Sequence, residues 1–244
     1  MTTHDVTPRD SAPPRLIVSE LFGPTFQGEG PSQGRRSMFL RLGGCNLACT
    51  WCDTPYTWDA TRFNLRAEMR PMSHLNILER LYAADPSCRR LVITGGEPTL
   101  QARGLRPLLT ILRDRQWWVE VETNGTRLPP YGPGHYVDQW NVSFKPPSAE
   151  NSTRTVDPDA AQAWANTLFA IFKFVVAGGA DWDFTQETVN RLGISPERVW
   201  VMPEGTAAPT ITDRLVWLAP RALHAGYNLS DRLHVRLWGN QRGR

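Results

Sequence analysis

The chain has 244 residues and a formal net charge of +3, because 27 basic residues nearly balance 24 acidic residues. This balance gives no sign of a nucleic-acid-binding surface or a basic membrane patch, so we expect neither partner. The sequence has no apolar run of about 18 residues and no signal-peptide pattern, which favours a cytoplasmic protein. We expect a disordered tail over residues 1–14 and a single α/β domain over residues 15–244.

The first expected strand covers residues 15–22, and a glycine-rich loop follows at residues 23–30, with the sequence Gly-Pro-Thr-Phe-Gln-Gly-Glu-Gly. Glycines let a backbone approach a ligand closely, although they mark ordinary turns far more often. A second strand is expected over residues 38–42, and it leads into a cysteine-rich segment.

Three cysteines follow this strand at the spacing C-x3-C-x2-C, namely Cys45, Cys49 and Cys52. Three neighbouring thiolates can hold three irons of a cubane iron–sulfur cluster, which needs four ligands, and leave the fourth iron open. A zinc site would need a further Cys or His at short spacing, and the nearest histidine is His74. The cysteines also make a poor disulfide framework, and Cys88 is expected to be a loop thiol with no assigned role.

A helix is expected after Ser73, which is a typical N-cap residue. The apolar face of this helix is predicted to consist of Leu75, Leu78, Leu81 and Tyr82. The next strand, at residues 91–93, runs into the turn Thr-Gly-Gly-Glu-Pro at residues 94–98. Its N–H groups and carboxylate suit an amino-acid ligand, although the turn could be only a tight connection. A second helix follows, with helical spacing of Leu105, Leu108, Leu109 and Leu112.

Later strands are expected at residues 117–123, 138–145, 171–176, 198–202 and 229–238. Helices are expected around Trp164 and Leu168, and over residues 211–218. Strands that alternate with helices predict an α/β barrel-like sheet with its functional loops after the carboxyl ends of the strands. The two lysines of the chain, Lys145 and Lys173, fall on expected strands, where lysine can serve as an adaptable buried cation.

The cysteine spacing, with Trp51 before the last cysteine, resembles that of the radical S-adenosylmethionine (SAM) enzymes. Three further stretches resemble one family among them, the 7-carboxy-7-deazaguanine synthases. These stretches are Phe-Gln-Gly-Glu-Gly at residues 26–30, the segment 38–54 and Leu-Trp-Gly-Asn at residues 237–240. The resemblance covers residues 16–243 and implies a partial, splayed TIM-like barrel of the radical SAM type.

The resemblance also implies an activity. Such an enzyme is a radical SAM lyase that removes a hydrogen atom from carbon 6 of 6-carboxy-5,6,7,8-tetrahydropterin. The ring then contracts with loss of ammonia to give 7-carboxy-7-deazaguanine, a step of deazapurine (queuosine-type) biosynthesis. Two alternatives remain at this point: an activating enzyme for glycyl-radical enzymes, and a non-catalytic module that binds a cluster or zinc.

The site residues implied by the resemblance fall into three groups, with no catalytic side chain beyond the cofactors. Residues implied in substrate binding are Phe26, Gln27, Gly28, Glu29, Arg41 and Thr94. Residues implied in SAM binding are Gly96, Glu97, Ser143, Phe144, Lys145, Met202, Pro203, Glu204 and Gly205. Metal ligands are Cys45, Cys49 and Cys52 for a [4Fe-4S] cluster and Thr54 for Mg²⁺.

Three of these assignments have particular reasons or alternatives. Arg41 would pair with the substrate carboxylate as a planar bidentate donor, or it could be only a solvated strand end. Thr54 would give one hard oxygen to magnesium, or it could cap its own loop. Phe144 stands where the family has proline. The family further implies a homodimer and an electron donor such as flavodoxin or ferredoxin.

Overall fold

The computed structural model describes residues 15–130, 136–150 and 156–244. The expected disordered tail at residues 1–14 lies outside these ranges, and the single domain over residues 15–244 stays a prediction. Within the described ranges no helix is both long enough and apolar enough to cross a membrane.

The described strands form one open sheet in the order β3-β1-β2-β4-β5-β6-β7-β8-β9. The strands from β2 to β9 in this order run parallel, whereas β1 is antiparallel to both β2 and β3. The sheet does not close, since its edges are β3 and β9, and this confirms the predicted partial barrel. The bounds are β1 Leu16–Phe26, β2 Arg36–Leu42, β3 Arg70–Met72, β4 Arg90–Gly95, β5 Trp118–Thr123, β6 Gln139–Val142, β7 Ala170–Val176, β8 Val199–Pro203 and β9 Asn228–Leu229.

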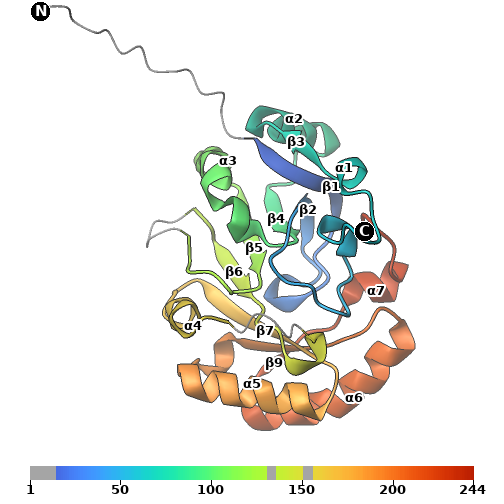
Figure 1. Ribbon diagram of the computed structural model, residues 1–244, viewed down its shortest axis with the longest axis vertical. Coiled ribbons are helices and arrows are strands. Elements are labelled where there is room, and N and C mark those ends of the chain that lie inside the picture. The colour runs from blue at the N-terminus through green and yellow to red at the C-terminus, as the bar shows by residue number, and fades with distance from the viewer. Residues whose placement is uncertain (1–14, 131–135, 151–155) are drawn as a thin grey trace, which may run out of the picture.

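The helices lie around the outside of the curved sheet (Figure 1). The α-helices are α1 Leu65–Glu68, α2 His74–Ala84, α3 Ala102–Asp114, α4 Pro158–Ala165, α5 Gly179–Leu192, α6 Ala208–Ala225 and α7 Leu233–Trp238. The 3-10 turns are η1 Gly30–Ser32, η2 Pro55–Thr57, η3 Pro98–Gln101, η4 Pro147–Ala149 and η5 Pro196–Arg198. One apolar core joins the helices to the outer face of the strands.

The two helices predicted from leucine spacing differ in outcome. All four predicted leucines of α3 are buried. In α2, Ser73 is the N-cap as predicted, and its side chain accepts a hydrogen bond from the Asn76 N–H. Leu75, however, is 68% exposed. The buried side chains of α2 are His74, Ile77, Leu78 and Leu81. These positions repeat at i, i+3, i+4 and i+7, and Leu75 lies one residue away from that stripe.

Strand β1 extends four residues further than expected, through Gly23 and Pro24 to Phe26. The pairing of β1 with β2 shifts register between Phe22 and Thr25. Such an irregularity lets a strand continue past residues that cannot join a regular ladder. The loop predicted at residues 23–30 therefore begins only after Phe26.

The strand predicted at residues 229–238 is wrong. Pairing ends at Leu229, and α7 begins at Leu233. The turn between them is fixed by polar groups: the Ser230 N–H donates to Val201 O, and the Arg232 N–H donates to the Asp231 carboxylate. Short apolar segments do not distinguish a strand from a helix, which explains the error.

Two residues assigned to regular elements lie outside them. Lys145 follows the end of β6 at Val142, just before two prolines, so it is a loop residue. Leu168 lies beyond the end of α4 at Ala165 and is 86% exposed. Lys173, in contrast, lies on β7 as predicted and is buried.

The corrected face of α2 gives a stability prediction. Leu81→Ala should lower the free energy of unfolding by about 2–5 kcal/mol, because it leaves a cavity in the core. Leu75→Ala, in the same helix, should change it by no more than about 0.5 kcal/mol. Urea unfolding of both variants measures the difference. Equal losses would place Leu75 in the core and contradict the observed packing.

Candidate active site

A cavity of about 220 Å³ lies at the carboxyl ends of the parallel strands. Its wall brings together most of the residues that the sequence predicted. These are Phe26, Gln27, Gly28, Glu29, Arg41, Cys45, Cys49, Cys52, Thr54, Thr94, Gly96, Ser143, Lys145, Met202 and Glu204. Four predicted residues are not on this wall, namely Glu97, Phe144, Pro203 and Gly205.

The cysteine loop, residues 43–54, joins β2 to η2 and brings three cysteines that form no disulfide to the cavity wall. It is held at both ends: the Gly44 N–H donates to Thr57 O at 2.7 Å, and the Thr50 N–H donates to Ala149 O at 3.2 Å. Cys88 is also free and lies in a loop, as predicted, but it is buried in the apolar core away from the cavity.

The cysteine set fits a cubane cluster better than a single zinc ion. In the described part of the chain, no group of three or more His, Cys, Asp or Glu side chains could hold one metal ion. Each cysteine of a cubane binds a different iron, so the three sulfurs need not meet at one point. Burial raises the pKa of Cys45 to about 11, so its thiol keeps its proton near neutral pH until a metal replaces it.

The Gly-Gly-Glu-Pro turn is fastened to the cysteine loop through its backbone. The Glu97 N–H donates to Gly44 O at 2.8 Å. A Cβ on Gly96 would lie 2.0 Å from Gly44 O, and Gly95 has a φ of +134° with Leu42 O 2.2 Å from its would-be Cβ. Both glycines are therefore needed for this close approach.

The carboxylate of Glu97 is occupied by the fold. Its Oε1 accepts hydrogen bonds from Thr99 N, Thr99 Oγ1 and Thr123 Oγ1, and its Oε2 accepts one from Asn124 N, all at 2.7–2.9 Å. The side chain is fully buried. Gly95 and Gly96 of this turn line the cavity and Glu97 does not, so the predicted contact between the Glu97 carboxylate and an amino-acid ligand stays a prediction.

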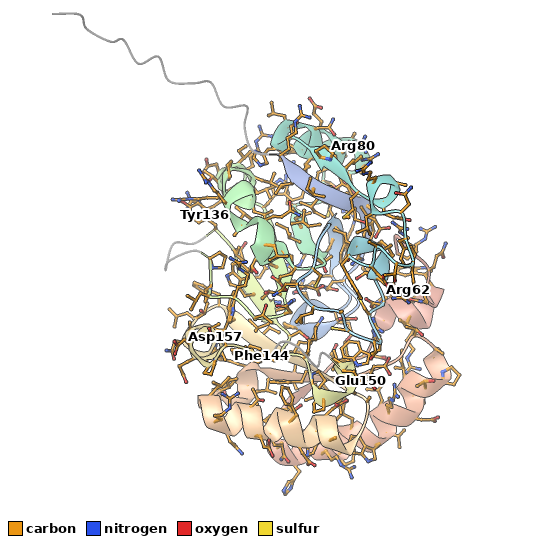
Figure 2. All side chains as sticks on the ribbon, viewed as in Figure 1. Arg62, Arg80, Tyr136, Phe144, Glu150 and Asp157 are labelled. Atoms are coloured by element: carbon orange, nitrogen blue, oxygen red, sulfur yellow. The ribbon has the colours of Figure 1, made fainter. Side chains whose placement is uncertain are left out.

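The three predicted residues after β6 face different sides. Phe144 lies in the core, whereas Ser143 and Lys145 line the cavity. Phe144 packs against Phe172 and Phe174, with ring centroids 5.9 and 6.4 Å away. Figure 2 shows Phe144 inside the fold, whereas Arg80 lies at its outer edge. Ser143 and Lys145 line the cavity, and Lys145 Nζ donates to Ser143 Oγ at 3.1 Å. The segment thus presents two polar side chains and hides the aromatic one.

In the loop after β8, residues that line the cavity also alternate with residues that do not. Met202 and Glu204 line the cavity, whereas Pro203 and Gly205 do not. Glu204 is bound by Arg214 of α6 through an ion pair and through its backbone oxygen. The side chain of Glu204 is therefore neutralised from the protein side.

Arg41 is oriented by a carboxylate behind it. Its Nε donates to Glu20 Oε2 at 2.7 Å, and the hydroxyl of Tyr56 donates to the same oxygen at 2.8 Å. Although burial disfavours charge, Tyr56 and Glu20 hold the pKa of Arg41 above its usual range. Because Nε is taken, the two terminal nitrogens remain for a ligand in the cavity. The alternative of a solvated strand end does not fit this geometry.

Polar side chains from neighbouring strands meet beside Arg41. Thr94, paired with Arg41 in the β2–β4 register, donates its hydroxyl to Glu122 Oε2 at 2.7 Å. Gln27 Nε2 donates to Glu120 Oε1 at 2.8 Å and lies 3.5 Å from Glu122 Oε1. These contacts orient two predicted binding residues.

Glu29 lies at the centre of a buried ion network. Lys173 Nζ contacts its Oε2 at 2.5 Å, and Arg232 Nε donates to its Oε1 at 3.0 Å. Burial alone would raise the pKa of Glu29, but Lys173, Arg232 and His234 lower it well below its usual range. Lys173 also lies 3.4 Å from Glu122 Oε1. This corner of the cavity is charged at neutral pH.

Sequence reasoning assigned no site role to several cavity residues: Glu122, Lys173, Arg232, His234, Asp53 and Trp58. Two of these residues have features in the sequence that could have indicated a role. Lys173 is one of two lysines in the chain and lies on an apolar strand, and Glu122 lies at the polar end of a strand. No sequence feature indicated a role for Arg232 or His234, because the segment that contains them was predicted to be a strand. His234 packs so closely on Gly28 that a Cβ there would lie 1.9 Å from its Nδ1.

Thr54 lies on the cavity wall and does not cap its loop. Its hydroxyl makes no capping hydrogen bond to η2, although Thr54 occupies the N-cap position. This hydroxyl lies 3.8 Å from Cys52 Sγ. The capping alternative is therefore wrong for η2, and Thr54 is one of the residues that line the cavity.

Comparison with known proteins gives one consistent answer. A model of the Radical SAM superfamily matches residues 40–145. The 7-carboxy-7-deazaguanine synthase of Pyrobaculum aerophilum is 36% identical over 96% of this chain and 100% of its own length. The synthase of Rhodopirellula baltica is 32% identical over 93% of this chain and 88% of its own. The crystal structure of QueE from Escherichia coli, at 24% identity, has a TM-score of 0.66 over 90% of this chain and 95% of that chain. This likeness and the superfamily match confirm the predicted fold of the radical SAM type.

The contact between the glycine turn and the cysteine loop can be tested. Gly96→Ala should lose most of its capacity to bind iron and sulfide on anaerobic reconstitution, because the new Cβ displaces Gly44 and the adjoining Cys45. Gly179→Ala is the matched control, since nothing lies within 4 Å of its would-be Cβ. Iron and sulfide per chain are the measurement, and equal loading of both variants would contradict the argument.

Proposed function

The chain belongs to the 7-carboxy-7-deazaguanine synthase family of radical SAM enzymes, and on that basis we propose that it converts 6-carboxy-5,6,7,8-tetrahydropterin to 7-carboxy-7-deazaguanine and ammonia. The observation that carries the proposal is that Cys45, Cys49 and Cys52 share one cavity with an oriented arginine, Arg41. A glycyl-radical activator or a cluster-binding module would have no need for such a carboxylate clamp.

The cofactors would occupy the side of the cavity built by the cysteine loop. When bound, the [4Fe-4S] cluster and SAM supply the radical that removes a hydrogen atom from the substrate. Cys45, Cys49 and Cys52 would hold the cluster. The turn at Gly96 and the side chains of Ser143, Lys145, Met202 and Glu204 would contact SAM. We assign the Glu97, Phe144, Pro203 and Gly205 positions a supporting role, because none of these residues lines the cavity.

The substrate would lie between Arg41 and the charged corner. The free edge of the Arg41 guanidinium would bind the substrate carboxylate through two parallel hydrogen bonds. Glu29 and Glu122 carry acceptor oxygens that suit the N–H groups of a pterin ring, and Gln27, Thr94 and Lys173 fix their positions. Phe26 would cover the ring from the rim, where it stacks on Trp238 at 6.4 Å.

Magnesium would bind at Thr54. The threonine hydroxyl is a hard oxygen next to the soft thiolate of Cys52, so the two positions suit different metals. Mg²⁺ keeps several waters and takes few protein ligands, which agrees with a single hydroxyl on the wall of an open cavity.

The remaining parts of the proposal rest on the family resemblance. We propose a homodimer in the cytoplasm that receives electrons from a flavodoxin or ferredoxin. The product would enter the biosynthesis of queuosine or another deazapurine.

Anaerobic turnover tests the function. Reconstituted protein with SAM, a reductant, Mg²⁺ and the carboxytetrahydropterin should give a product lighter than the substrate by one ammonia, with ammonia released in equal amount. Arg41→Met should lose about 2–5 kcal/mol of transition-state stabilisation yet bind SAM normally, because a desolvated carboxylate would lose its partner. Arg70→Met, an exposed arginine on β3, is the control. No product from cluster-loaded wild type would refute the function, and equal loss of SAM binding in Arg41→Met would refute the role of Arg41.

The magnesium site has its own test. Thr54→Val keeps the shape of the side chain and removes the oxygen, so its turnover after chelation should no longer respond to added Mg²⁺ as the wild type does. Thr50→Val, in the same loop but exposed and off the cavity wall, should respond normally. A normal magnesium response in Thr54→Val would show that this hydroxyl is not a ligand.

A further inference from the structure

An indole N–H points at one of the three cavity cysteines. Trp58 Nε1 donates to Cys52 Sγ at 3.4 Å, and its ring lines the cavity. The backbone N–H of Leu47 makes a similar contact to Cys45 Sγ at 3.4 Å. The Trp58 contact comes from a side chain, so it can be removed without altering the backbone.

The turn that carries Trp58 is held in place by hydrogen bonds within the protein. Trp58 follows η2, where its own N–H donates to Pro55 O at 3.0 Å, and the Thr57 hydroxyl donates to Thr54 O at 2.8 Å. The same turn is tied to the cysteine loop by the bond from Gly44 N to Thr57 O. The donor is thus preorganised beside the sulfur.

Donation to a cysteine sulfur changes the electron affinity of an iron–sulfur cluster. The reduced cluster carries one more negative charge, so a hydrogen bond to its sulfur stabilises the reduced form more than the oxidised form. We propose that Trp58 is a positioning residue that raises the reduction potential of the cluster through Cys52. The inference rests on the proposed function in one respect, namely that Cys52 is a cluster ligand.

A second tryptophan provides a matched comparison. Trp51 directly precedes Cys52 in the sequence, but its Nε1 donates to Ser148 Oγ at 3.2 Å instead of to a cysteine. Its ring faces Lys145 Nζ, which lies 5.8 Å from the ring centroid. Both indoles are half-buried; Trp51 lies in the cysteine loop and Trp58 four residues after it, and they differ in the atom that accepts the N–H.

The experiment compares Trp58→Phe with Trp51→Phe, both reconstituted anaerobically. The midpoint potential is measured by redox titration followed by electron paramagnetic resonance, without substrate. Trp58→Phe should keep wild-type iron and sulfide content, and at a fixed potential its ratio of reduced to oxidised cluster should fall roughly tenfold, or about 59 mV for one electron. Trp51→Phe should keep the wild-type potential.

Equal potentials in wild type and Trp58→Phe, with full cluster content, would overturn the inference and leave the proposed function intact. A wild type that holds no cluster would instead overturn the proposed function. If Trp58→Phe failed to hold the cluster, the hydrogen bond would be tested directly. Pulsed electron paramagnetic resonance would be recorded on Trp51→Phe whose tryptophan indole nitrogens are isotopically labelled. A coupling between the reduced cluster and an indole nitrogen supports the hydrogen bond, and its absence refutes it.

Discussion

The candidate site depends on one guanidinium, that of Arg232. Its Nε donates to Glu29 at 3.0 Å, its Nη2 donates to Asp53 at 2.6 Å, and its Nη1 donates to Gly205 O at 2.5 Å. These partners belong to the loop after β1, the cysteine loop and the loop after β8. A buried charge is tolerated only when it is paired and hydrogen-bonded, so the three loops must keep this arrangement together.

The charge of Arg232 also stabilises a carboxylate inside the partial barrel. Arg232 and Lys173 both pair with Glu29 and lower its pKa, and Lys173 also lies 3.4 Å from Glu122 Oε1. Further from the cavity, burial raises the pKa of Glu120, which accepts hydrogen bonds from the side-chain amides of Gln27 and Asn141. Glu120 and Glu122 are two residues apart on β5 and therefore face the same side of the sheet. Gln27 Nε2 lies within 3.5 Å of an oxygen of each carboxylate and so connects the two side chains.

The sequence predicted those parts of the fold and site that depend on short-range pattern. Each of these patterns involves residues that are close together in the chain. They are the three cysteines, the buried leucines of α3 and the glycine turn after β4. Arg232 lies 203 residues from Glu29 in the sequence, and no local pattern predicts that these two residues form a pair. The hydrogen bonds of Glu97 were not predicted for a related reason: the threonines of η3 and β5 that donate to its carboxylate come together only in the fold. Local sequence identified the loops, whereas only the tertiary structure shows which of their polar groups are already satisfied.

The departure at Phe144 shows how such a site tolerates change. Residues along an extended segment face alternate sides, so Ser143 and Lys145 point to the cavity while Phe144 points to the core. The ring fills the space beside Gly125, where an added Cβ would lie 2.5 Å from it, and it packs against Phe172. Phe144 therefore contributes to the packing of the core side. Ser143 and Lys145, on either side of it, line the cavity.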